Sequence, residues 1–216
     1  MSCPTGGNAA LDLILSRSDE LHTSIWRQID AVSFDSSPRS ETVYDMCGIA
    51  LEHATSLRIL IASGCPTSAV TLMRPQFEAL TRSIWILYAA SEGEITRLRA
   101  PLDVLGEQRA KNMPLASEML RQLSTSAPAG AYQMLTQCKD ATWGAMNSFV
   151  HGGIHPLRRH SDGYPLPLIV QVVQTSNALS TMVGMVLANL TGDEGVTKPM
   201  SQLQLSFADC LPPLVR

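Results

Sequence analysis

The longest stretch without a charged residue runs from Gly163 to Gly192 and is rich in Leu, Val and Met. A segment of this length and composition either crosses a membrane or forms a helix at the centre of a protein. Lipid offers no partner to polar side chains, yet several lie near the middle of the segment: Gln171, Gln174, Thr175, Ser176 and Asn177. We therefore expect no membrane contact. The segment predicts a central helix at about 165–190, buried on most sides and available for a subunit interface.

Apolar residues recur at helical spacing in most of the remaining chain. Aromatic residues make up only 5% of the sequence, which favours packed helices over a β-sandwich or barrel. The sequence therefore predicts an all-α protein, a helical bundle of about five long helices plus short helices. The other long helices are expected at about 8–32 (capped by Asn8 or Gly7), from Ser37 or Ser40 to Ser63, at 67–91 and at 128–150. Pro75 removes one hydrogen bond from the 67–91 ladder, so we expect a kink there.

The 216 residues fit a single helical domain, 1–216. The segment 92–126 is more polar and is interrupted by prolines and a glycine, which predicts a broken-helix insertion or flap. The segment 192–216 is expected to form a C-terminal appendage with a short helix at about 198–209.

The net charge of −3 gives no global basic field, so nucleic acid would have to meet a local patch. The five cysteines are widely spaced and form no CxxC pair, as is typical of reduced thiols in a cytoplasmic protein. The N-terminal residues lack the pattern of a signal peptide. We therefore expect a cytoplasmic location.

Three charged residues, Arg74, Glu78 and Arg82, are spaced four apart on the predicted 67–91 helix. They would form one line of alternating charge among very apolar neighbours. Such a line either faces an anion, such as RNA phosphate, or is an internal ladder of ion pairs that fixes helix packing. The degree of burial distinguishes the two interpretations.

Three of the five histidines fall in the segment 147–165, NSFVHGGIHPLRRHSDGYP: His151, His155 and His160. Gly152 and Gly153 suit the left-handed end of the 128–150 helix, and we expect a mildly basic loop to follow.

His151 and His155 are four apart, but glycines intervene and no acidic residue lies near, so we expect no metal site and no cofactor. Arg158, Arg159 and His160 would instead form a small basic edge that binds phosphate, or cap a helix end and meet solvent.

Two segments together resemble a known family. The stretch AVTLMRPQFEALTRSIWILYAAS is similar to the recurring RPxxEAxxRxxWL helix of uncharacterised bacterial helical proteins, and MNSFVHGGIHPLRRH is similar to their NS[YF]xHGG segment. The resemblance covers most of residues 8–190. These proteins are of unknown function and are similar in outline to the HEPN superfamily. HEPN proteins are helical bundles, often dimeric, and many are ribonucleases of toxin–antitoxin and phage-defence systems.

The resemblance implies a HEPN-like fold, a homo-oligomer and a site where the two segments meet. It makes His151, Arg74 and Glu78 the candidate catalytic residues, and we take as candidate ligand-binding residues Arg82, Asn147, His155, Arg158 and Arg159. HEPN ribonucleases carry an arginine separated by four to six residues from the catalytic histidine. Before His151 those positions hold no arginine but Gly144, Ala145 and Met146.

Because this catalytic pattern is incomplete, we expect a non-catalytic interaction or ligand-binding module with a polar Arg/Glu/His pocket. One alternative is a HEPN-like RNA-binding or ribonuclease protein. A second is a metal-dependent hydrolase that uses His151 and His155. The sequence leaves open whether the protein is an enzyme. RNA and a phosphorylated small ligand are the partners that these hypotheses imply.

Overall fold

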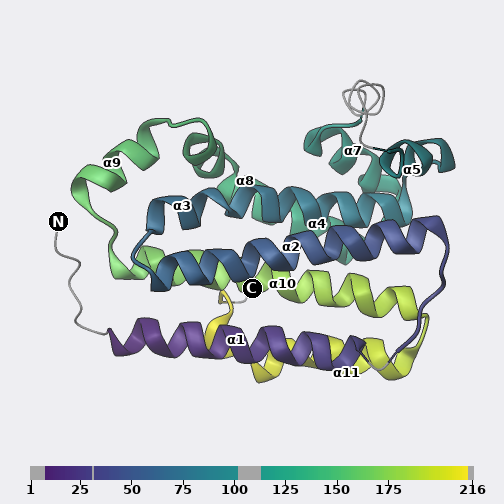
Figure 1. The fold of residues 1–216 in the computed structure, drawn as a ribbon, viewed down its shortest axis with the longest axis horizontal. Coiled ribbons are helices and arrows are strands. Elements are labelled where there is room, and N and C mark those ends of the chain that lie inside the picture. The colour runs from purple at the N-terminus through teal and green to yellow at the C-terminus, as the bar shows by residue number, and fades with distance from the viewer. Residues whose placement is uncertain (1–7, 31, 102–112, 214–216) are drawn as a thin grey trace.

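A computed structural model describes residues 8–30, 32–101 and 113–213. Every regular element in these ranges is helical, which confirms the all-α prediction (Figure 1). The elements are α1 (Ala9–Ile29), α2 (Pro38–Ala62), α3 (Pro66–Thr71), α4 (Met73–Tyr88), α5 (Glu92–Leu98), α7 (Ala116–Ser126), α8 (Ala129–Val150), α9 (Ile154–Asp162), α10 (Leu166–Thr191), α11 (Glu194–Ser206) and the 3-10 turn η1 (Ala208–Cys210). The long helices of the described ranges are α1, α2, α4, α8 and α10, in agreement with the predicted bundle.

The helices are stacked in layers around α10 and α2 (Figure 1). α2 packs along α4 and α10, and α10 also contacts α1, α4 and α11. α8 lies on the other side of α3 and α4, where it contacts both of them together with α7 and α9. The central position predicted for the uncharged helix is therefore the position of α10.

Polar side chains in the middle of α10 are hydrogen-bonded inside the core. Gln76 of α4 donates to the carbonyl of Ser176 at 2.9 Å, and the Ser176 hydroxyl donates back to Gln76 Oε1 at 2.7 Å. Asn177 donates to Ser18 Oγ and to the Cys210 carbonyl, both at 2.8 Å. These bonds join α10 to α4, α1 and the C-terminal turn, because buried polar groups need partners within the protein.

None of the helices in the described ranges has the length and apolar character that a membrane span requires.

The predicted helix 67–91 is divided into α3 and α4 by a break at Leu72. Pro75 lies in the first turn of α4, where a missing N–H is tolerated. The α4 ladder begins with the N–H of Gln76, which donates to the Leu72 carbonyl at 3.1 Å. The predicted kink therefore takes the form of a break between two successive helices that continue in one direction (Figure 1).

Several helix ends follow the capping signals of the sequence. The side chain of Asn8 accepts from the Ala10 N–H and begins α1, and Ser37 begins α2 in the same way. α8 ends at Val150, and Gly152 takes the left-handed conformation with φ +63°, as predicted.

Two helix boundaries were predicted wrongly. α11 begins at Glu194 and not near 198, because the Asp193 side chain accepts from the Gly195 N–H at 2.7 Å and so caps the helix early. The same helix ends at Ser206 and not near 209, and Pro199 lies inside it.

The expected loop after Gly153 is also a correction, because it contains the helix α9. Pro156 falls in the first turn, where its missing N–H is harmless. The hydroxyl of Ser148, from the preceding helix, accepts from the His155 N–H at 3.1 Å. Gly163, with φ +86°, ends the helix. Capping from outside the segment thus stabilises a helix that its own sequence signals only weakly.

Within the predicted insertion 92–126, α5 packs against α2, and α7 packs against α4 and α8. The part of the insertion at 102–112 lies outside the described residues. In the segment 192–216, α11 packs against α1 and α10, and Arg17 donates to the Ser206 carbonyl at 2.9 Å.

The four described cysteines are free thiols. Burial raises the pKa of Cys47 to about 12 and that of Cys210 to about 11, so both are poor nucleophiles. Cys65 is exposed.

His22 on α1 is held as a neutral imidazole. Its Nε2 accepts from Trp26 Nε1 at 3.1 Å, and its Nδ1 is buried with no hydrogen-bond partner among the described residues. Burial lowers the pKa of His22, the positive charge of Arg58 lowers it further, and Asp19 opposes both. The folded protein therefore resists protonation of this ring.

We expect His22 to make the protein less stable as the pH falls below about 6.5, the ordinary pKa of histidine. In that range the unfolded chain binds a proton that the folded chain does not, so the free energy of unfolding rises with pH. The contribution is complete above the unfolded pKa and is lost as the pH drops toward the lower native pKa. Urea unfolding between about pH 5 and pH 7 should give a shallower pH dependence for His22→Phe than for the unchanged protein, and equal slopes would exclude His22 as a cause.

Candidate functional site

Arg74 brings α4 and α8 together at one polar cluster, which we define as Arg74, Glu78, Trp143 and His151. Arg74 Nε donates to Glu78 Oε1 at 2.9 Å, one helical turn away on α4. Arg74 Nη1 lies 3.1 Å from His151 Nε2, at the C-cap of α8. The guanidinium carbon lies 5.0 Å from the centroid of the Trp143 ring, two turns earlier on α8. The structure thus brings together the three candidate catalytic residues of the sequence.

The chemistry of this cluster is largely satisfied within the protein. A guanidinium only donates hydrogen bonds, so Nε2 of His151 is the acceptor in this contact. Glu78 offsets the charge of Arg74, and the Trp143 ring gives a further cation–π contact. The Arg74 side chain is 21% exposed and that of Glu78 36%, so water reaches the cluster. An external anion would have to displace Glu78, and the cluster serves first to join the end of α8 to α4.

Arg82 does not extend this cluster as the sequence had indicated. It is half-buried on α4, and within the described part of the chain no ion pair joins it to Glu78. Burial lowers the pKa of Arg82, and the negative charge of Glu78 opposes that shift. The predicted ladder of alternating charge is therefore wrong beyond its first pair.

Asn147 and the following residues build the connection between α8 and α9. The Asn147 carbonyl accepts from the His151 N–H at 3.1 Å, and the Gly153 N–H donates to the Ser148 carbonyl at 2.7 Å. These bonds, with Gly152 in the left-handed region, form the usual terminus of a helix that ends on glycine. The side-chain Oδ1 of Asn147 is buried and has no partner in the part of the chain that the structure describes.

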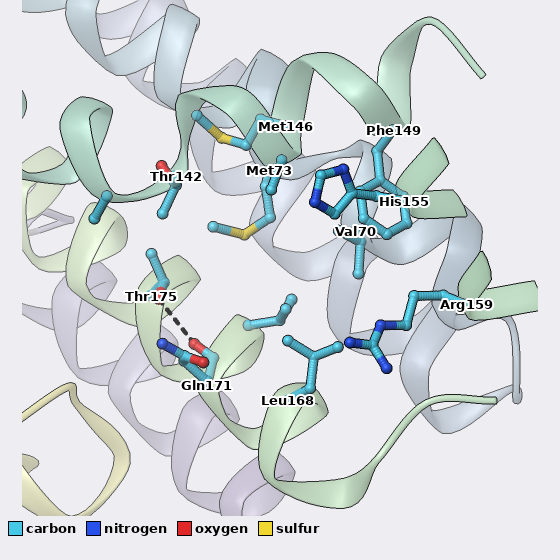
Figure 2. A pocket seen from close by; sticks show the side chains of 13 residues that line it. Val70, Met73, Thr142, Met146, Phe149, His155, Arg159, Leu168, Gln171 and Thr175 are labelled. Atoms are coloured by element: carbon cyan, nitrogen blue, oxygen red, sulfur yellow. Dashed lines mark hydrogen bonds between the residues drawn. The ribbon is translucent and has the colours of Figure 1, made fainter. Parts of the chain in front are cut away.

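A cavity of about 200 Å³ lies beside this connection, between α8, α9, α10 and the α3–α4 break (Figure 2). Most of its wall is apolar. The main apolar contacts come from Val70, Met73, Ala145, Met146, Phe149, Leu168 and Val172. The cavity does not include Arg74, Glu78 or His151, so the predicted polar pocket and the actual cavity are neighbouring but separate features.

Two basic side chains of α9 line one end of the cavity. His155 and Arg159 are one turn apart and therefore share a face of the helix. Figure 2 shows both extending from α9 toward the apolar wall, with Arg159 directed toward Leu168. Neither side chain has a hydrogen bond or ion pair among the described residues. Arg158, the other arginine of the predicted basic edge, is exposed and does not line the cavity.

Two threonines, Thr142 and Thr175, line the opposite end of the cavity (Figure 2). Thr175 Oγ1 donates to the Gln171 carbonyl at 2.8 Å, and Thr142 Oγ1 donates to the Cys138 carbonyl at 2.6 Å. Because each hydroxyl already uses its proton within its own helix, both can still accept a hydrogen bond from a ligand.

The sequence reasoning found two residues of this cavity but not the cavity itself. It paired His155 with His151 and placed Arg159 with Arg158 and His160 in one basic edge of a loop, whereas the helix α9 puts His155 and Arg159 on the cavity and leaves Arg158 outside it. Their spacing of four would have indicated a shared face had a helix been expected there.

Within the described residues, no group of three or more His, Cys, Asp or Glu side chains is placed to hold a metal ion. His151 and His155 therefore have no third ligand in that part of the chain.

Comparisons with known proteins place the chain by family alone. No curated protein and no solved structure matches it. The model of one family matches residues 47–213, a range that includes α4, α8, α9 and α10 and hence both the polar cluster and the cavity. Since this match covers most of the sequence, the chain belongs to the family of unknown function DUF6988.

Proposed function

We propose that this protein is a non-catalytic binding module that holds a small organic anion in the cavity between α8, α9 and α10. The observation that carries the proposal is the pair His155 and Arg159, two basic side chains at the end of an apolar cavity that form no hydrogen bond or ion pair with the residues the structure describes. Arg159 is half-buried and His155 is exposed at the rim. Partly burying the guanidinium of Arg159 without a partner is unfavourable, so a bound anion would relieve this arrangement. Ligand sites commonly combine an apolar wall with a few polar groups of this kind.

The polar cluster supports this function by fixing the cavity wall. Arg74 holds the last turn of α8 against α4, and α9 begins at Ile154, four residues after α8 ends at Val150. Ser148 then binds the first turn of α9. The direction of His155 and Arg159 therefore depends on contacts that Arg74, Glu78 and His151 help to maintain, so these three act as positioning residues in the proposal.

The test compares two adjacent arginines. A panel of small carboxylates and phosphate esters is screened by thermal unfolding against the unchanged protein, Arg159→Gln and Arg158→Gln. A ligand at a hundred times its Kd stabilises a protein by about 2.7 kcal/mol, which for a chain of this size raises Tm by roughly 5–10 °C. We expect such a shift in the unchanged protein and in Arg158→Gln, and its loss in Arg159→Gln. The proposal fails if no anion shifts Tm, or if both variants respond alike.

A second candidate function is that of a HEPN-like ribonuclease. In this case the protein would be a bacterial, cytoplasmic homodimer, as the resemblance to HEPN proteins implies. One observation favours it, namely the contact between Arg74 and an exposed His151. If Arg74 turns from His151 toward a bound RNA, the freed Nε2 can accept a proton as a general base and the guanidinium can stabilise a phosphorane. Labelled RNA incubated with the pure protein and with His151→Ala tests this, since equal cleavage in the two samples would leave no role for His151.

A further inference from the structure

We infer that the anion is a small carboxylic acid with a single ring or a similarly compact apolar body, and with a hydroxyl or amino group opposite its carboxylate. This inference rests on the proposed function and names the ligand class of the same cavity. Three features carry it, namely the size of the cavity, the number of donors at its basic end and the acceptors at its far end.

The size of the cavity favours compact anions. An apolar cavity of about 150 Å³ holds a benzene molecule in another protein, whereas sites for drug-sized ligands measure about 300–1,000 Å³. At about 200 Å³, this cavity has room for one six-membered ring with small substituents. A nucleotide or a long acyl chain would extend beyond it. Met73, Met146 and Phe149 offer a ring the polarisable and aromatic contacts that it favours.

The basic end suits one carboxylate. The guanidinium of Arg159 presents paired donors that match two carboxylate oxygens, and the imidazole of His155 can donate a further bond. The backbone offers little more, since the His155 N–H is already bound to Ser148 Oγ. A phosphate dianion has more acceptor oxygens and more charge than this end can satisfy, because Arg158 and His160 are exposed and do not line the cavity.

The far end selects for a donor on the ligand. The hydroxyls of Thr142 and Thr175 already donate to carbonyls of their own helices, so toward a ligand each can act only as an acceptor. A ligand hydroxyl or amino group at that end gains a hydrogen bond, while a ligand carbonyl there would meet two acceptors. The acid is thus bound at its carboxylate by α9 and at its opposite end by α8 and α10.

Titration calorimetry on the full chain provides the test, with 4-hydroxybenzoate, benzoate, decanoate and phenyl phosphate as probes. We expect 4-hydroxybenzoate to bind at least tenfold more tightly than benzoate, and both more tightly than decanoate or phenyl phosphate. Arg159→Gln should weaken both benzoates at least tenfold, and Arg158→Gln should leave them unchanged. The double variant Thr142→Val, Thr175→Val should remove the preference for the hydroxylated ring and leave the affinity for benzoate within about twofold, because valine keeps the shape of threonine.

The outcomes separate the two proposals. If phenyl phosphate or decanoate binds best, and Arg159→Gln abolishes that binding, the ligand class is wrong although the cavity still binds an anion. If none of the four probes binds while another anion in the thermal screen does so through Arg159, the ligand class is again overturned alone. If no anion binds through Arg159 in either experiment, both proposals fail.

Discussion

Replacing Trp85 with alanine is expected to lower the free energy of unfolding by about 3–5 kcal/mol, as large-to-small changes at buried aromatic residues do. Trp85 is fully buried on α4, and its ring fills the space between α4 and its neighbours. Its Nε1 donates to Gln122 Oε1 on α7 at 2.7 Å, so alanine would also leave that acceptor without its partner. The loss combines a large cavity with a broken contact between α4 and α7.

Trp85→Phe is the matched control, because it keeps an aromatic ring in the core and removes only the indole N–H and part of the volume. We expect it to cost about 1–2 kcal/mol, mostly from the lost hydrogen bond and the smaller ring. Urea unfolding of the three proteins measures both effects, provided that the m-value stays constant. A loss for alanine that is no greater than the loss for phenylalanine would mean that the surrounding helices collapse into the cavity.

The long helices could be predicted because their buried faces consist of apolar residues that recur at helical spacing. α10 is the clearest case, because an uncharged stretch of this length is buried either in a membrane or in the core of a protein. Its polar residues need hydrogen-bond partners, which lipid does not supply. Those partners, Gln76 and Ser18 among them, come from distant segments and could not be identified from spacing. The sequence therefore indicates that the polar residues of α10 form hydrogen bonds, but only the fold determines which residues are their partners.

The short helix α9 could not be predicted because its first turn is bound from outside. Ser148 lies seven residues before His155 and on another helix, yet it accepts the His155 N–H. Capping rules look one to three residues ahead of a helix, so they miss a cap supplied across a turn. Missing α9 also meant missing the shared face of His155 and Arg159, and with it the cavity.

In the candidate site, the family resemblance predicted that Arg74 and His151 lie close together. Helical spacing alone predicted the pair of Arg74 and Glu78. Arg82 shows the limit of that periodicity. Equal spacing on a helix permits an ion pair, but partial burial and packing decide whether the side chains meet. The apolar wall of the cavity comes from four separate segments, and only the tertiary arrangement assembles it.

Gly153, which follows α8, lies close to Ser148 and should therefore affect the stability of the protein. Replacing Gly153 with alanine is expected to lower the free energy of unfolding by about 1–3 kcal/mol, the range for forcing atoms into a packed site. A Cβ at this position would lie 2.6 Å from Ser148 Oγ and 3.3 Å from both Ser148 Cα and Ser148 Cβ. The backbone itself permits alanine, because φ is −76°. The cost is therefore steric, and it falls on the hydroxyl that caps α9.

Gly144, inside α8, is the matched control for Gly153. A Cβ there would meet nothing within 4 Å, so Gly144→Ala should stabilise the protein by about 0.5–1 kcal/mol through helix propensity. Urea unfolding should thus give opposite signs for two glycine-to-alanine changes nine residues apart. Two destabilising results of equal size would mean that close approach to Ser148 is not the reason for Gly153.

Adding Ser148→Ala to Gly153→Ala identifies the atoms responsible. Ser148→Ala alone should cost about 1 kcal/mol, because it removes the acceptor for the His155 N–H. In the double variant the closest contact, to Oγ, is gone, so the combined loss should be smaller than the sum of the single losses. If the losses add, the strain lies against the Ser148 backbone instead. The affinity of each variant for the anion can be compared with its loss of stability. A displaced first turn of α9 would carry His155 away from the cavity, so the variant with the larger displacement should bind the anion more weakly.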